Sequence, residues 1–218
     1  MFIRVFAEAG SVSGLFVKQG AFIVFEGLDG SGVSVQAVLL DSYLRKKGYK
    51  TLLTKEPTTG LIGNAIRDAL KGMNGQSSYK SIQLLFCADR AKHLEDEILP
   101  ALEKGRIVIC DRYIFSTLAY GYASKLNYRW LRQLNLSFRL PDLGILLDVK
   151  PSVSLGRISS SVSSFEIFNK EKELSDVRKA FMMIASNFHL KVIDGNGSVE
   201  ETRSKIMKVV DRFLEKGR

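Results

Sequence analysis

Short apolar runs recur along the chain and alternate with segments of helical periodicity. Beyond the first run, for example, apolar side chains at 35, 38, 39 and 43 follow helical spacing. The runs that we interpret as strands lie at 21–26, 50–54, 107–110, 143–148 and 190–193. Strands that alternate with helices are typical of a parallel sheet covered by helices on both faces. We therefore predict a three-layer α/β fold with a five-stranded parallel sheet.

Polar residues follow each predicted strand at the point where it ends. In parallel α/β sheets, ligands bind outside the carboxyl ends of the strands. The polar positions are Asp29 after the first strand and the segments 55–57, 111–113, 148–150 and 194–196 after the other four. The pattern thus predicts that ligands bind at this edge of the sheet.

The segment 27–34, between the first strand and the first helix, has the pattern of a phosphate-binding loop. Gly27, Gly32 and Ser34 stand where G-x-x-x-x-G-K-[ST] requires them, but Val33 stands in place of the lysine. In such loops backbone N–H groups surround a polyphosphate, the lysine reaches the β- and γ-phosphates, and the hydroxyl binds Mg²⁺. The flanking strand and helix supply the expected context. We predict phosphate binding of the P-loop NTPase type.

Composition and charge narrow the class of protein. The 218 residues carry 32 Lys and Arg against 23 Asp and Glu, a net charge of +9, which suits polyanionic partners such as nucleotides. The basic residues are scattered, without a zinc finger or a basic arm, so we expect no nucleic-acid binding. The hydrophobic fraction of 45% is ordinary for a globular protein.

The remaining features concern domains and location. Length favours one domain at 21–218, preceded by an N-terminal extension of unknown structure at 1–20. That extension is interrupted by charges, so it is neither a secretory segment nor a membrane span, and we expect a cytoplasmic protein without membrane contact. Cys87 and Cys110 are interpreted as reduced core residues. A serine-rich stretch at 158–169 predicts a flexible, lid-like loop between two helices.

Several further motifs follow one another along the chain. They are 22–32, Lys55 to Pro57, Ile62 and Gly63 with Arg67, 85–90 with His93, Asp111 to Tyr113 with Ser116 and Tyr120, Pro141 and Asp142, and Leu147 and Asp148. In this order they closely resemble thymidylate kinases, from about residue 21 to the C-terminus. The resemblance implies transfer of the γ-phosphoryl group of ATP to dTMP with Mg²⁺, and a homodimer.

The resemblance also implies roles on the dTMP side. Phe86 would stack on the thymine, and Arg90, one helical turn later, would donate to a base carbonyl. Asp29 would accept from the sugar 3′-OH, because a carboxylate beside a polyphosphate is electrostatically costly unless it binds a hydroxyl. Packing in the core is the alternative for Phe86, and half-buried packing for Tyr120. The full set of expected dTMP-binding residues is Asp29, Glu56, Arg67, Phe86, Arg90, Arg112, Ser116 and Tyr120.

On the ATP side, the loop amides would wrap the phosphates at the helix N-terminus. Adenine would lie between the segment after Arg157 and the turn at 194–196. Ser34 and, through water, Asp111 would hold Mg²⁺, and Asp111, Arg112 and Arg157 are the expected catalytic residues. An ion pair between Asp111 and Arg112 is the structural alternative. The expected ATP-binding residues are Gly27, Gly30, Ser31, Gly32, Val33, Ser34, Val35 and Gly195.

The sequence departs from thymidylate kinases where positive charge is expected. Gly30 stands where a loop arginine can occur, Val33 replaces the lysine, and the stretch 158–169 holds no basic residue. Cations on the developing charge supply much of the rate in phosphoryl transfer. Candidates for compensation are Lys150, Arg157, Lys170 and Lys172. Gly121 also stands where a glutamine is common.

Two further functions therefore remain open beside a dTMP kinase. One is a catalytically impaired, nucleotide-binding relative that keeps the dTMP pocket. The other is a deoxynucleoside kinase, which is disfavoured because Arg67 and Arg112 anticipate an acceptor that already carries a phosphate.

Overall fold

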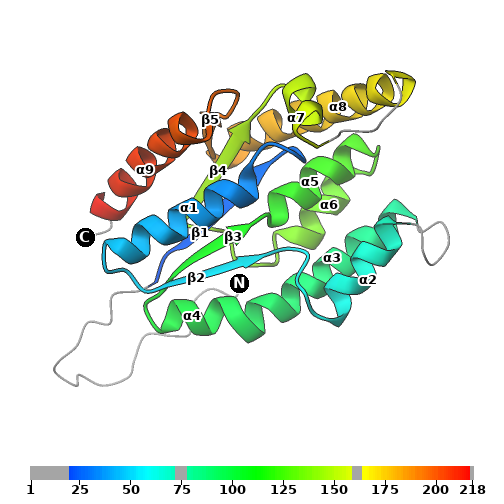
Figure 1. The fold of residues 1–218 in the computed structure, drawn as a ribbon. Coiled ribbons are helices and arrows are strands. Elements are labelled where there is room, and N and C mark those ends of the chain that lie inside the picture. Colours follow the sequence, from blue (N-terminus) through cyan, green and yellow to red (C-terminus); the bar gives the residue numbers. More distant parts are fainter. Residues whose placement is uncertain (1–19, 72–77, 159–163, 217–218) are drawn as a thin grey trace.

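The computed structural model describes residues 20–71, 78–158 and 164–216, which fold around one five-stranded sheet (Figure 1). All strand pairs are parallel, in the order β2-β3-β1-β4-β5. The predicted α/β fold is confirmed, and each predicted strand lies within one residue of its observed bounds. The strands are β1 Phe22–Gly27, β2 Thr51–Lys55, β3 Ile107–Asp111, β4 Leu143–Asp148 and β5 Lys191–Asp194.

Helices pack on both faces of the sheet because successive side chains of a strand point to opposite faces. On one face, Ile23 and Phe25 of β1 are buried against α1 (Val33–Lys46) and α9 (Val199–Lys216). On the other face, Phe22 and Val24 join a larger apolar cluster. That cluster contains side chains of η1 (Leu94–Ile98), α4 (Leu99–Glu103), α5 (Ile114–Ala123), α6 (Tyr128–Asn135) and α8 (Ser164–Phe188).

The strand register aligns the carboxyl ends of the three strands that carry the polar motifs. Phe25 of β1 lies opposite Asp111 of β3, and Lys55 of β2 lies opposite the same Asp111. β1 lies between β3 and β4; the chain passes from β1 to β2 on one side and later from β3 to β4 on the other, so the connections diverge at β1 and a crevice forms at this edge. The helices α2 (Leu61–Leu70) and α3 (Tyr79–His93) follow β2 and flank this crevice.

The segment predicted as a lid-like loop is partly helical. Helix α7 (Pro151–Ile158) precedes it, residues 159–163 lie outside the described part, and α8 begins at Ser164. The loop prediction is therefore wrong for 164–169. Serine is a favoured residue at a helix start, and no glycine or proline follows it in this stretch, so the helix can extend through it.

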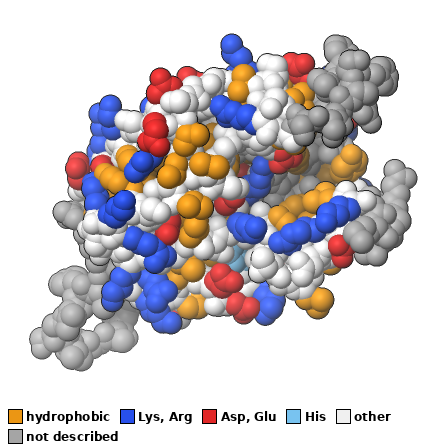
Figure 2. All heavy atoms as spheres, viewed as in Figure 1, with side chains coloured by type: hydrophobic (Ala, Val, Ile, Leu, Met, Phe, Trp, Pro, Cys, Tyr) orange, Lys and Arg blue, Asp and Glu red, His pale blue; other side chains and the backbone are white. Residues whose placement is uncertain are grey.

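The structure describes part of what the sequence predicts about the N-terminal extension, the cysteines and the surface. The expected extension lies outside the described residues except for Gly20, whose N–H donates to the Leu102 carbonyl at 3.2 Å. Both cysteines are free; Cys110 is buried and Cys87 is half-buried. Figure 2 shows Lys and Arg interspersed with acidic and apolar side chains on the face in view. Within the described ranges, no helix has the length and hydropathy needed to cross a bilayer.

Candidate functional site

The loop between β1 and α1 adopts a conformation that glycine makes accessible. Gly30 and Gly32 have φ angles of 78° and 91°, in the left-handed region that residues with a side chain rarely adopt. Gly32 is the N-cap of α1, so the first N–H groups of the helix face the loop. A Cβ on Gly30 would lie 2.5 Å from the Ser154 carbonyl oxygen of α7, so the loop also packs closely there.

A cavity of about 660 Å³ lies against this loop, within the usual range of ligand pockets, about 300–1,000 Å³. Segments far apart in the sequence meet there. Its lining includes all the expected ATP-binding residues except Gly27, together with Asp29, Arg112, Arg157 and residues 197–199. The two loop glycines, the start of α1 and the turn after β5 thus surround one space at a helix N-terminus, where anions bind.

Two oxygen ligands for a divalent cation meet beside the loop. The Ser34 hydroxyl donates to Oδ2 of Asp111 at 2.5 Å, which joins the start of α1 to the end of β3. Mg²⁺ is usually bound by one or two such oxygens together with substrate phosphates and water. Among the described residues no group of three or more His, Cys, Asp or Glu could hold a metal alone. The pair therefore fits a cation that arrives with a polyphosphate.

The position of the missing lysine is buried. Val33 is 4% exposed and belongs to the apolar cluster of Ile23 and Phe25. A candidate replacement for its charge is Arg157 of α7, whose guanidinium donates to the backbone carbonyls of Ser31 at 3.4 Å, Gly195 at 3.1 Å and Gly197 at 3.3 Å. These acceptors are neutral, so the contacts place a positive charge in the cavity without cancelling it.

Arg112 lies at the centre of the crevice, directly after β3. Its φ angle of 69° is unusual for a residue with a side chain. The guanidinium donates to the Gly27 carbonyl at 3.0 Å, to Asp29 Oδ1 at 2.6 Å and to Ser116 Oγ at 3.3 Å. Burial opposes its charge, but Tyr120 and the nearby carboxylates outweigh burial and raise the pKa of Arg112. The ion pair of Arg112 is with Asp29, and not with Asp111 as the structural alternative would have it.

Glu26, the residue before the loop, is fully buried beneath Arg112. It accepts from the Tyr113 N–H at 3.0 Å and from the Ser116 hydroxyl. Burial raises the pKa of Glu26 from 4.5 to about 7, although Ser116 and Arg112 oppose the shift. Ser116 thus contacts both Glu26 and Arg112, and it links the buried Glu26 to Arg112 in the crevice.

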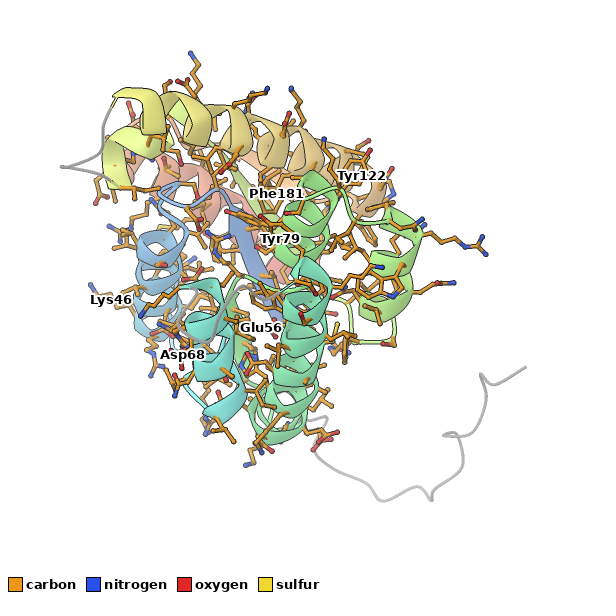
Figure 3. The ribbon with its side chains drawn as sticks, turned by 90° about the vertical axis from the view of Figure 1, so that its right-hand side faces the viewer. Lys46, Glu56, Asp68, Tyr79, Tyr122 and Phe181 are labelled. Atoms are coloured by element: carbon orange, nitrogen blue, oxygen red, sulfur yellow. The ribbon has the colours of Figure 1, made fainter. Side chains whose placement is uncertain are left out.

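A second cavity of about 270 Å³ lies between α3 and α5. It contains the expected Phe86, Ser116 and Tyr120, and Phe86 belongs to neither apolar core cluster. The Tyr120 hydroxyl accepts from the Asp29 N–H at 3.2 Å, and its ring lies 5.7 Å from the Arg112 guanidinium carbon. Figure 3 shows Tyr79 at the end of α3 that lies next to α5. Phe86 therefore presents its ring to a cavity rather than to the core.

Arg90 and Glu56 form a buried network at the base of this cavity. Arg90 donates to Glu56 Oε2 at 2.7 Å from Nη2 and 3.0 Å from Nε, to Thr117 at 2.8 Å and to Asn135 at 2.5 Å. Glu56 Oε1 lies 3.2 Å from His93 Nδ1. Figure 3 places Glu56 between α2 and α3. Both residues line the cavity, but most of their polar groups already have protein partners.

The structure does not bring Arg67 to the lining of either cavity. Its guanidinium donates to the carbonyl of Thr58 at 2.7 Å and to that of Pro57 at 3.2 Å. Asp89 holds the same segment by accepting from the Thr58 N–H and hydroxyl. In this structure Arg67 therefore binds the backbone of the segment after β2, and its contact with a phosphate stays a prediction.

Several residues of the site were not identified from the sequence. Thr117 and Asn135 hold Arg90, and Gln83 lines the second cavity from α3. Their residue types are common in helices, so no local signal marked them. Glu26 did carry a signal, because it is a carboxylate in an otherwise apolar strand.

The fold and the two cavities define a phosphate-loop nucleotide-binding protein with space for a second ligand beside the loop. A family model described as thymidylate kinase matches residues 25–206. A probable thymidylate kinase of Pyrococcus abyssi is 42% identical over 90% of this chain and 98% of its own length. One of Pyrococcus horikoshii is 43% identical over the same shares, and a thymidylate kinase of Caldicellulosiruptor saccharolyticus is 35% identical over 91% and 99%. The chain belongs to the thymidylate kinase family.

Proposed function

We propose that this protein transfers the γ-phosphoryl group of ATP to dTMP, producing dTDP and ADP. One observation carries the proposal: Asp29 and Arg112 line both the loop cavity and the second cavity. A phosphate donor in the first and an acceptor in the second would therefore meet at these two side chains. Positioning of this kind, with charge on the transferred group, supplies most of the catalysis in phosphoryl transfer.

In the loop cavity, the amides of 31–35 bind the ATP phosphates, and the turn that contains Gly195 lies beside the adenine. Ser34 and, through water, Asp111 would hold Mg²⁺, which would supply positive charge to the β- and γ-oxygens. The 2.5 Å contact between their side chains supports this assignment, since it brings both oxygens to the same place beside the loop.

In the second cavity, Phe86 stacks on the thymine and Arg90 donates to a base carbonyl. Asp29 accepts from the sugar 3′-OH, and Ser116 and Tyr120 complete the wall beside the sugar. Arg112 holds the acceptor or transferred phosphate between the two cavities. Glu56 acts through Arg90, to which it is bonded at 2.7 Å.

Arg157 supplies the charge that the loop lysine would otherwise provide. Its position in the loop cavity, with only neutral carbonyls as hydrogen-bond acceptors among the described residues, supports this role. The competing function is a nucleotide-binding relative that does not transfer phosphate. The buried valine at position 33 is the observation that favours it.

We further infer a cytoplasmic homodimer without nucleic-acid partners. Leu61, Leu70 and Leu84 of the neighbouring helices α2 and α3 are each more than half exposed, which supports a protein contact on that side. Light scattering of the purified chain tests the dimer, because a monomer mass at micromolar concentration would contradict it.

A coupled assay of ADP release tests the proposed function. With ATP, Mg²⁺ and dTMP, we expect steady ADP production that depends on all three components. Omission of dTMP controls for simple ATP hydrolysis. Tight dTMP binding without ADP release would favour the nucleotide-binding alternative.

A further inference from the structure

The side chain of Gln83 occupies the second cavity in an unusual way. It is 4% exposed, and its Oε1 has no hydrogen-bond partner within residues 20–71, 78–158 and 164–216. Buried polar groups are normally paired, so an unpaired amide oxygen at a cavity wall requires an explanation. A ligand that enters the cavity and completes the pairing is one such explanation.

Helix geometry places Gln83 beside the residues that surround the proposed base. Tyr79, Gln83, Phe86 and Arg90 are separated by four, three and four positions, so they share one face of α3. All four line the second cavity. Gln83 lies about one turn before Phe86, and Arg90 lies about one turn after it. A ring stacked on Phe86 would therefore have the Gln83 amide near one part of its edge and the Arg90 guanidinium near another.

The facing helix leaves room for this amide. A Cβ on Gly121 of α5 would lie 3.2 Å from Nε2 of Gln83 and 2.8 Å from a methyl carbon of Leu131. Glycine within a helix is less stable than alanine, so its presence here indicates that the space is used. The space that a side chain at position 121 would fill is occupied by the methyl groups of Leu131 and by the end of Gln83.

We infer that Gln83 is a specificity-determining residue that hydrogen-bonds the N3 edge of the pyrimidine. This inference rests on the proposed function, because it takes dTMP as the ligand of the second cavity. The carboxamide offers one acceptor and two donors. The thymine edge offers the N3–H donor next to carbonyl acceptors, so Oε1 accepts from N3–H while Nε2 donates to an adjacent carbonyl. This requires only a turn of the amide about its last side-chain bond.

The test compares dTMP with N3-methyl-dTMP, in which a methyl group replaces the N3 hydrogen. Dissociation constants are measured by calorimetry for the wild-type protein, for Gln83→Ala and for Gln83→Asn. Gln133→Ala is the matched control, since Gln133 is an exposed glutamine on α6 outside the second cavity. Thermal unfolding verifies that each variant is folded, and Gln83→Asn keeps a shorter amide at the site in case the alanine variant does not fold.

We expect the wild-type protein and Gln133→Ala to prefer dTMP by about tenfold or more, the scale of one lost hydrogen bond to a buried group. In both Gln83 variants the preference should fall to about twofold or less, because the partner of N3–H is withdrawn and the methyl group gains room.

Two results would overturn the inference. One is a wild-type protein that binds both nucleotides equally, and the other is a preference that persists in the Gln83 variants. Each is distinct from failure of the proposed function, in which the wild-type protein would neither bind nor phosphorylate dTMP.

Discussion

Replacement of Arg157 by methionine should slow phosphoryl transfer while leaving dTMP binding unchanged. Of the two basic side chains that line the loop cavity among the described residues, Arg112 is paired with Asp29 at 2.6 Å, whereas the acceptors of Arg157 are three backbone carbonyls. The positive charge of Arg157 therefore has no acidic partner among the described residues, and it is available to the β- and γ-phosphates. Loss of a single preorganised donor to developing charge typically costs about 10²–10³ in turnover.

Single-turnover measurements of dTDP formation at saturating ATP, Mg²⁺ and dTMP give this rate directly. We expect a decrease of about 10²–10³ in Arg157→Met, equivalent to about 3–4 kcal/mol in the transition state. Arg45→Met, on the exposed side of α1, is the matched control and should keep the wild-type rate. A rate in Arg157→Met within about twofold of wild type would refute the assignment of the cation.

Three further perturbations test other parts of the site. Phe86→Ala should weaken dTMP binding by about 1–3 kcal/mol in calorimetry, the scale of base–aromatic stacking, and an unchanged affinity would remove the stacking role. Val33→Lys in the Arg157→Met background should recover at least about tenfold in turnover, because a charge-assisted phosphate contact returns, whereas no recovery would mean that position 33 does not reach the phosphates. The contribution of Glu26 to the free energy of unfolding should fall as pH rises from 4.5 to about 7. In this range the carboxyl ionises in the unfolded chain, whereas burial keeps it protonated in the folded state. Measured by urea unfolding, the free energy of unfolding of the wild type relative to that of Glu26→Gln should fall by about 3 kcal/mol across that window. A difference that does not change with pH would contradict the raised pKa.

The fold could be predicted from the sequence because its central strands are buried on both faces. Runs such as 143–148 are apolar throughout and bounded by polar residues, which marks both their type and their ends. The phosphate-binding loop could also be predicted from the sequence, because it requires glycines. Gly30 and Gly32 adopt φ angles that few other residues tolerate. The helical start of α8 at Ser164 was missed because serine serves both loops and helix starts.

The partners of the charged residues could not be predicted, because they depend on contacts between distant segments. Arg90 was expected to donate to a base carbonyl, and its spacing did not indicate that Glu56, Thr117 and Asn135 from three other segments also bond to it. Likewise Arg67 lies on the expected helix but bonds to backbone carbonyls nearby. Helical spacing predicts on which face of the helix a side chain lies. It does not predict which residue of another segment bonds to that side chain.

The central claim is that this chain transfers a phosphoryl group despite its valine at position 33. The most direct measurement follows label from γ-³²P-ATP in the presence of Mg²⁺ and dTMP, with the products separated by chromatography. The account predicts label in dTDP, formed in proportion to enzyme and absent when dTMP is left out. Label that remains in ATP or appears only as inorganic phosphate, under conditions in which dTMP is bound, would contradict it.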